Sequence, residues 1–67
     1  MGKLAKRLAR RIQSLRGEES QRSFSQKLGI EQATLSRLER ARENVTLATL
    51  EKLCRYFKRD VGWFFKM

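Results

Sequence analysis

The stretch that decides the fold runs Ser20-Gln21-Arg22-Ser23-Phe24-Ser25-Gln26-Lys27-Leu28-Gly29-Ile30-Glu31-Gln32-Ala33-Thr34-Leu35-Ser36-Arg37-Leu38-Glu39. Its apolar residues recur at helical spacing on both sides of Gly29. Ser20 is a good N-cap for a first helix, and Gly29 can adopt the left-handed conformation that a sharp turn requires. The stretch therefore predicts two short amphipathic helices hinged at one glycine, an arrangement that can place a rigid row of side chains in a groove of DNA.

The two predicted helices each have an inward and an outward face. Phe24 and Leu28 are the inward pair of the first helix, with the small Ser25 beside them. In the second helix, from about Gln32 to Arg40, the inward residues on a wheel of about 100° per residue are Leu35 and Leu38. The opposite face is polar and basic and carries Ala33, Ser36, Arg37 and Arg40. At the start of this helix Glu31 occupies the N-cap slot, where Ser or Thr would serve better.

The flanking segments predict three further helices. A helix from about Lys3 to Arg16, ended by Gly17, has the apolar stripe Leu4, Leu8, Ile12 and Leu15. Another, capped by Thr46, has the stripe Leu47, Leu50, Leu53, Cys54 and Phe57. Asp60 can cap a last short helix over about residues 61–65. The prediction is an all-α fold of five helices, forming one domain over residues 1–67 with the helix pair at residues 20–40.

Charge is the strongest compositional feature. Sixteen Lys and Arg against seven Asp and Glu give a formal net charge of +9, which favours polyanionic partners and disfavours self-association. With one cysteine, Cys54, and no histidine, the chain has no means of forming an internal disulfide or an ordinary zinc site. We expect no metal, no cofactor and no enzymatic activity. The absence of an 18-residue apolar run and of a secretory signal predicts a cytoplasmic protein without a membrane partner.

The segment from Leu8 to Phe65 resembles the Cro/CI-type (XRE-like) helix-turn-helix family of prokaryotic and phage regulators. The residues that carry the resemblance are Ser20-Gln21, Phe24-Ser25, Lys27-Leu28-Gly29-Ile30 and Thr34-Leu35-Ser36-Arg37-Leu38-Glu39-Arg40, followed by Asn44, Leu47, Leu50 and the closing Val61-Gly62-Trp63-Phe64. The resemblance implies a compact lambda-repressor-like domain that binds double-stranded DNA and regulates transcription. The chain departs from the family pattern in the loop after residue 40, where Ala41 stands in place of a common glycine and Val45 in place of a common proline.

The resemblance also implies roles for individual residues. Those expected to contact base edges in the major groove are Gln32, Ala33, Ser36 and Arg37. Those expected to contact phosphates are Gln21, Arg22, Arg40, Arg42 and Asn44. Arg16 and Glu39 are expected to form an ion pair between the first and third helices. The chemistry fits these roles, because Gln pairs bidentately with adenine, Arg pairs with guanine, and the Ala methyl contacts that of thymine.

The aromatic residues near residue 65 have two interpretations. Three adjacent aromatics, Trp63, Phe64 and Phe65, cannot all point inward from one helical turn. They either close a small core or contribute to a dimer interface, and the resemblance places this tail near a two-fold axis. We expect Tyr56, Trp63 and Phe65 to lie in a homodimer interface.

Several alternatives to a repressor acting on a palindromic operator remain open. The same fold serves the antitoxin of a toxin–antitoxin pair, which would bind a toxin protein, and the controller protein of a restriction–modification system. An RNA-binding or non-specific nucleic-acid-binding protein would share the basic charge. The basic 3–16 helix could lie on a membrane surface, but its narrow apolar stripe without aromatics favours core packing.

Overall fold

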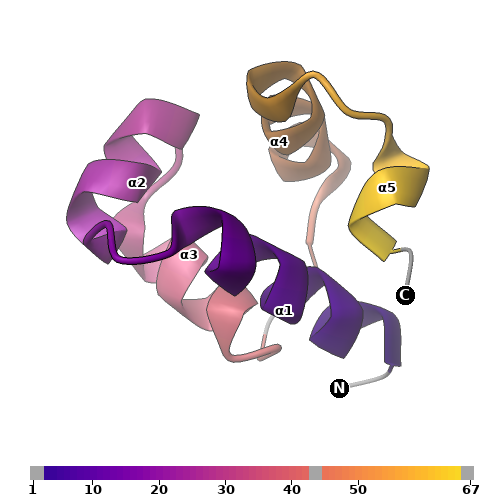
Figure 1. Ribbon diagram of the computed structural model, residues 1–67, viewed down its shortest axis with the longest axis horizontal. Helices are drawn as coiled ribbons and strands as arrows, with labels where there is room; N and C mark the ends of the chain where they lie inside the picture. Colours follow the sequence, from indigo (N-terminus) through magenta and orange to yellow (C-terminus); the bar gives the residue numbers. More distant parts are fainter. Residues whose placement is uncertain (1–2, 43–44, 66–67) are drawn as a thin grey trace.

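The computed structural model describes residues 3–42 and 45–65, and these residues fold into five helices without a strand (Figure 1). The helices are α1 (Lys3–Arg16), α2 (Gln21–Leu28), α3 (Gln32–Glu39), α4 (Leu47–Phe57) and α5 (Val61–Phe65). The long α1 packs against α3 and α5, α2 packs against α3 and α4, and α4 packs against α5. The predicted all-α fold of five helices is confirmed.

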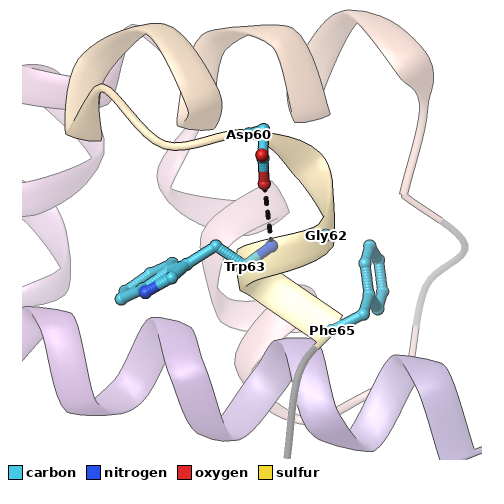
Figure 2. Close-up of a pocket in the computed structure, with 4 residues that line it drawn as sticks. All are labelled: Asp60, Gly62, Trp63 and Phe65. Atoms are coloured by element: carbon cyan, nitrogen blue, oxygen red, sulfur yellow. Dashed lines mark hydrogen bonds between the residues drawn. The ribbon is translucent and has the colours of Figure 1, made fainter.

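Side chains cap the starts of three helices. The Ser20 Oγ accepts a hydrogen bond from the Ser23 main-chain N–H at 3.1 Å, and the Thr46 Oγ1 accepts one from Thr49 at 3.1 Å. The Asp60 Oδ1 accepts the Trp63 main-chain N–H at 3.2 Å (Figure 2). Glu31 makes no side-chain capping bond at the start of α3. The three predicted caps are therefore present, and Glu31 is the poor cap that its side chain predicts.

Residues in the left-handed conformation follow α2, α3 and α4. Gly29, after α2, has φ 76°, and the Ile30 N–H returns to the Ser25 carbonyl at 3.1 Å. Ala41, after α3, has φ 55°. Its N–H donates to the Leu38 carbonyl at 3.1 Å, and the Arg42 N–H donates to the Arg37 carbonyl at 3.0 Å. This pair of bonds is a Schellman motif, in which glycine is the preferred residue. Lys58, with φ 55°, ends α4 in the same conformation.

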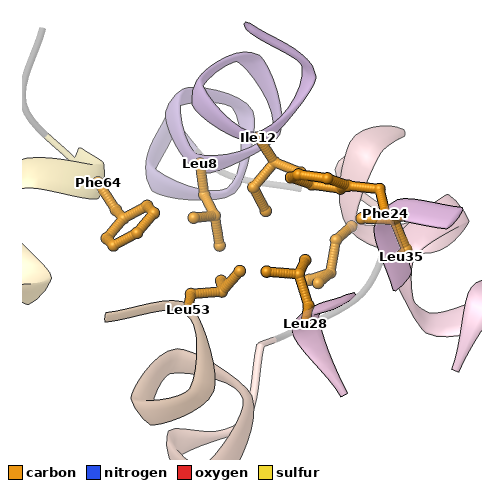
Figure 3. Close-up of a cluster of buried hydrophobic side chains, with 8 residues drawn as sticks. Leu8, Ile12, Phe24, Leu28, Leu35, Leu53 and Phe64 are labelled. Atoms are coloured by element: carbon orange, nitrogen blue, oxygen red, sulfur yellow. The ribbon is translucent and has the colours of Figure 1, made fainter. Parts of the chain in front are cut away.

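All five helices contribute to one hydrophobic core. Its buried members are Leu8, Ile12, Phe24, Leu28, Leu35, Leu38, Leu53 and Phe64, and their side chains converge between the helices (Figure 3). The inward assignments on both helices of the quoted stretch are thereby confirmed. Ile30, just after the turn, packs partly buried against the same core and holds the start of α3 to it.

Two assignments of the apolar stripes are wrong. The exposed fraction is 59% for Leu4 and 78% for Leu47. Each lies in the first turn of its helix, at the edge of a core that is too small to cover both ends of α1 and α4. Conversely, Ala9 is 4% exposed and belongs to the buried face of α1, which the stripe of larger residues did not predict.

Candidate nucleic-acid interface

One buried carboxylate joins the first three helices. The Glu39 side chain, 5% exposed, accepts two bonds from Arg16, with Nε at 2.7 Å from Oε2 and Nη2 at 2.9 Å from Oε1. The Gln21 Nε2 also donates to Oε1, at 3.2 Å. Glu39 lies on α3, Arg16 on α1 and Gln21 on α2. The structure thus brings Arg16 and Glu39 together, and it adds Gln21 to the pair.

The Arg16 guanidinium also fixes the connection between α1 and α2. Its Nη1 donates to the Glu19 carbonyl at 2.7 Å. The hydrogen bonds and charge of Glu39 raise the pKa of Arg16 above its ordinary value, so the guanidinium stays charged at every physiological pH. Gln13 supports the same junction, because its side-chain amide donates to the Glu39 main-chain carbonyl. The role of Gln13 was missed, although its position one turn before Arg16 places both on one helix edge.

The outward face of α3 is the surface that this junction orients. Gln32, Ala33 and Arg37 are exposed and Ser36 is half-buried, while Leu35 and Leu38 face the core. Because α3 is held on the core side by these leucines and at its end by Glu39, its outward side chains project from a rigid support. A row of this kind has the chemistry to read base edges.

The residues predicted to contact phosphate have different surroundings. Arg22, Arg40 and Arg42 are exposed. Gln21 is half-buried and its amide is bonded to Glu39. That amide has a second hydrogen, and the main-chain N–H of Gln21 lies in the first turn of α2, so both are donors of the kind that bind phosphate. Asn44 lies outside the described residues.

Two acidic side chains at the junction, Glu19 and Glu39, are paired with cations. The Glu19 Oε2 lies 2.8 Å from the Lys27 Nζ and accepts the Ser23 hydroxyl at 2.6 Å. The bond from Lys27, followed by that from Ser23, lowers the pKa of the Glu19 carboxyl, and Glu19 in turn raises the pKa of Lys27. Since Arg16 neutralises Glu39 as well, neither carboxylate adds a net negative charge to this part of the surface.

The aromatic tail divides between core and surface. Phe64 is fully buried, whereas Trp63 and Phe65 are half-buried and line a hollow with Asp60 and Gly62. Figure 2 shows the two rings on opposite sides of α5. Tyr56, 45% exposed, lines a different hollow with Leu28, Lys52 and Arg55. The three residues expected to share a dimer interface are therefore divided between two hollows.

Two guanidiniums lie against the indole of Trp63. The guanidinium carbon of Arg11, on α1, is 4.3 Å from the ring centroid, and that of Arg59, before α5, is 5.0 Å from it. Both distances are typical of cation–π contacts. Neither contact was predicted, because both join segments that are distant in the sequence or separated by a turn.

Other kinds of site find no support among the described residues. Within residues 3–42 and 45–65 no group of acidic, histidine or cysteine side chains is arranged to hold a metal ion. None of the described helices combines the length and the apolar character needed to cross a membrane. Cys54 is a half-buried free thiol on the core side of α4.

Comparison with known protein families gives a match over most of the chain. A family model described as Helix-turn-helix covers residues 12–64, which is most of the chain and includes α2, α3 and the junction at Glu39. Neither the curated proteins nor the solved structures gave a match.

Proposed function

The chain belongs to the Cro/CI-type (XRE-like) helix-turn-helix family of DNA-binding regulators, and from this premise we propose that it is a sequence-specific repressor. It would act in the cytoplasm as a homodimer on a palindromic operator, where occupancy blocks access of RNA polymerase. The observation that carries the proposal is the exposed row Gln32, Ala33 and Arg37 on a helix that Arg16 and Glu39 lock to the rest of the domain.

Base reading requires a rigid support as well as suitable side chains. A bidentate contact contributes about 1–3 kcal/mol of discrimination only when the side chain meets both hydrogen-bonding atoms on the major-groove edge of the base together. Leu35 and Leu38 fix the rotation of α3 about its axis, and Glu39 fixes the position of its end. The helix backbone therefore needs little ordering on meeting DNA.

Phosphate contacts on both sides of α3 would set its register in the groove. The exposed Arg40 and Arg42 follow α3, while Arg22 and the N-terminus of α2 precede it. Such contacts determine orientation but carry no direct sequence information. Specificity would then rest on Gln32, Ala33, Ser36 and Arg37.

A dimer is proposed because one helix reads too few base pairs. Two half-sites about one helical turn, ~34 Å, apart give a longer site. The Cα atoms of one copy span 26 × 23 × 22 Å, so two copies at that spacing can touch through their side chains when their longest axes lie along the line between them. We place the contact on the α5 face, which carries Trp63 and Phe65.

Selection of bound duplexes from a random pool tests the proposal. We expect a palindromic consensus with half-sites about one turn apart. The affinity for this duplex should exceed that for a scrambled one by ~10³ or more at physiological salt. The affinity of the Arg37→Ala variant for the consensus duplex is compared with that of Arg55→Ala. Arg55 lies on the face that carries the Tyr56 hollow, so Arg55→Ala is the matched control. Equal affinity for consensus and scrambled duplexes would refute sequence-specific binding.

A further inference from the structure

The hollow between α2 and α4 contains none of the residues proposed to contact DNA. Leu28, at the end of α2, lines it together with Lys52, Arg55 and Tyr56 of α4, at the top of Figure 1. Its volume is about 260 Å³, and its lining is mostly apolar. Pockets that enclose a small molecule usually measure about 300–1,000 Å³. An open hollow below that size suits a side chain presented by another protein.

Three of the four lining residues are held in place by the rest of the domain. The Lys52 Nζ donates to the Gly29 carbonyl, in the turn between α2 and α3, at 2.9 Å. The Tyr56 ring stands edge-on to the ring of Phe57, with 4.9 Å between their centroids. Leu28 is 4% exposed and belongs to the hydrophobic core. Because these side chains are already ordered, a partner that binds here would lose little free energy in immobilising them.

The rim of the hollow is positively charged. Lys52 keeps two N–H donors beyond its bond to the turn, and the exposed Arg55 carries five. Among the residues that the structure describes, no carboxylate lines the hollow. Glu51, the acidic residue of α4, lies about 140° around the helix from Tyr56, at about 100° per residue. The hollow therefore combines an apolar interior with cations at its edge.

We propose that this hollow is the docking site for an acidic segment of a partner protein, in which an aliphatic or aromatic side chain is flanked by carboxylates. The apolar side chain fills the hollow against Leu28 and Tyr56, and the carboxylates bind Lys52 and Arg55. Tyrosine and arginine are among the residue types whose truncation weakens protein–protein binding most. A second copy of this chain is a poor occupant, because two chains of formal net charge +9 repel each other. The site goes beyond DNA binding and does not depend on the proposed function.

Selection of random displayed peptides on the full-length protein tests the proposal. We expect the enriched peptides to share an apolar residue between aspartates or glutamates. Their affinity, measured by fluorescence anisotropy, should fall about tenfold in Tyr56→Ala and in Arg55→Gln. Added NaCl should also weaken binding, because the cations at the rim are exposed. Arg10→Gln makes the same change in net charge on the exposed side of α1 and should leave the affinity near the wild-type value.

The same variants show which results overturn the proposal. Arg55→Gln changes only an exposed side chain, so it decides the test if far-UV circular dichroism shows that Tyr56→Ala is unfolded. A selection that enriches no peptides, peptides without carboxylates, or peptides that bind Arg55→Gln as tightly as wild type would overturn the docking site.

DNA titration and sedimentation velocity exclude the other occupants of the hollow. Arg55→Gln should bind DNA as Arg10→Gln does and should leave the oligomeric state unchanged. A larger loss of DNA affinity in Arg55→Gln would assign the hollow to the DNA interface. A dimer that dissociates in Arg55→Gln would assign it to a second copy of this chain. Either result would overturn the acidic partner.

Discussion

Arg16 and Glu39, 23 positions apart in the chain, meet through two parallel hydrogen bonds of 2.7 and 2.9 Å between guanidinium and carboxylate. The pair connects the end of α1 to the last residue of α3, and Gln21 joins it from α2. Bidentate geometry adds direction to the attraction of the two charges. The relative placement of the three helices therefore depends on this one contact as well as on the core.

Removing one member of the pair should destabilise the domain severely. Arg16→Leu leaves the Glu39 carboxylate buried without its counter-charge, and such a loss costs about 3–5 kcal/mol. That is comparable with the whole stability of a domain of this size, about 3–5 kcal/mol, so the variant should be largely unfolded. Urea unfolding followed by far-UV circular dichroism measures the effect.

The double variant Arg16→Leu with Glu39→Leu is the control for this prediction. Replacing both charges by apolar side chains removes the buried orphan charge and should recover most of the lost stability. Lys27→Gln, which breaks the exposed pair with Glu19, should shift the unfolding midpoint only slightly. A single Arg16→Leu variant as stable as wild type would show that the pair contributes nothing.

Glycine at two left-handed positions should stabilise the domain. Ala41 and Lys58 both have φ 55°, a conformation that costs an L-residue with a side chain about 1–2 kcal/mol. The greater freedom of glycine in the unfolded chain offsets part of this gain. Ala41→Gly and Lys58→Gly should each raise the free energy of unfolding by about 0.5–1 kcal/mol, as measured by urea denaturation.

Gly29→Ala provides the reverse experiment. Gly29 has φ 76°, and an added Cβ would meet no atom within 4 Å, so the substitution introduces backbone strain without a clash. A loss of about 1 kcal/mol is expected. No change in stability for any of the three variants would contradict the assigned backbone conformations.

A better N-cap at position 31 should also stabilise the protein. Glu31 makes no side-chain bond to the start of α3, whereas Ser20 and Thr46 cap α2 and α4. Glu31→Ser should add about 1 kcal/mol, and Ser20→Ala should remove a similar amount. Thermal or urea denaturation of the two variants checks the prediction, which fails if the serine gives no gain.

Arg37→Ala should relax the choice of base at one position in each half-site. The discrimination in favour of the preferred base at that position should fall by about 1–3 kcal/mol, with little effect on the other positions. Arg42→Ala, predicted to remove a phosphate contact, should weaken binding to all duplexes alike and lower the salt slope by about 1. Titrations of single-base variants of the selected duplex distinguish these outcomes, and a uniform loss for Arg37→Ala would assign it to the phosphate backbone.

The pair of Glu19 and Lys27 predicts a pH dependence of stability. Hydrogen bonds from Lys27 and Ser23 lower the pKa of Glu19 from its ordinary 4.5, so the folded state holds the proton less tightly than the unfolded chain. The resulting stabilisation is complete above pH 4.5 and disappears as the pH falls through the lowered value. The pKa of Lys27 is raised above its ordinary 10.5, so its pairing stabilises the folded state below pH 10.5. This stabilisation is lost as the pH rises through the raised value.

The urea unfolding midpoints of wild type and Glu19→Gln across a pH series check the direction of this pH dependence. The two curves should differ at neutral pH and converge in acid, and added salt should reduce the difference because both charges are near the surface. A difference that grows as the pH falls would contradict the assigned pairing.

Local signals in the sequence were sufficient to predict the five helices. Ser20, Thr46 and Asp60 cap helices because their side-chain oxygens reach a main-chain N–H three residues later, and Gly29 turns the chain because it has no Cβ. The periodicity of Phe24, Leu28, Leu35 and Leu38 likewise separates inside from outside, because residues three or four apart share a helix face. These properties depend only on neighbouring residues.

Tertiary packing decided what periodicity could not. Leu4 and Leu47 fit their apolar stripes but lie exposed, because burial depends on whether another helix covers that turn. Three features arise only when the five helices are placed in space: the contact of Gln21 with Glu39, the two guanidiniums on Trp63, and the division of the tail aromatics between two hollows. The sequence by itself therefore determined the helices, their ends and the outward row on α3, since those follow from short-range geometry. The family resemblance implied the pair of Arg16 and Glu39. Only the tertiary structure determined which other charges meet, because Coulomb and hydrogen-bond contacts depend on distance in space rather than along the chain.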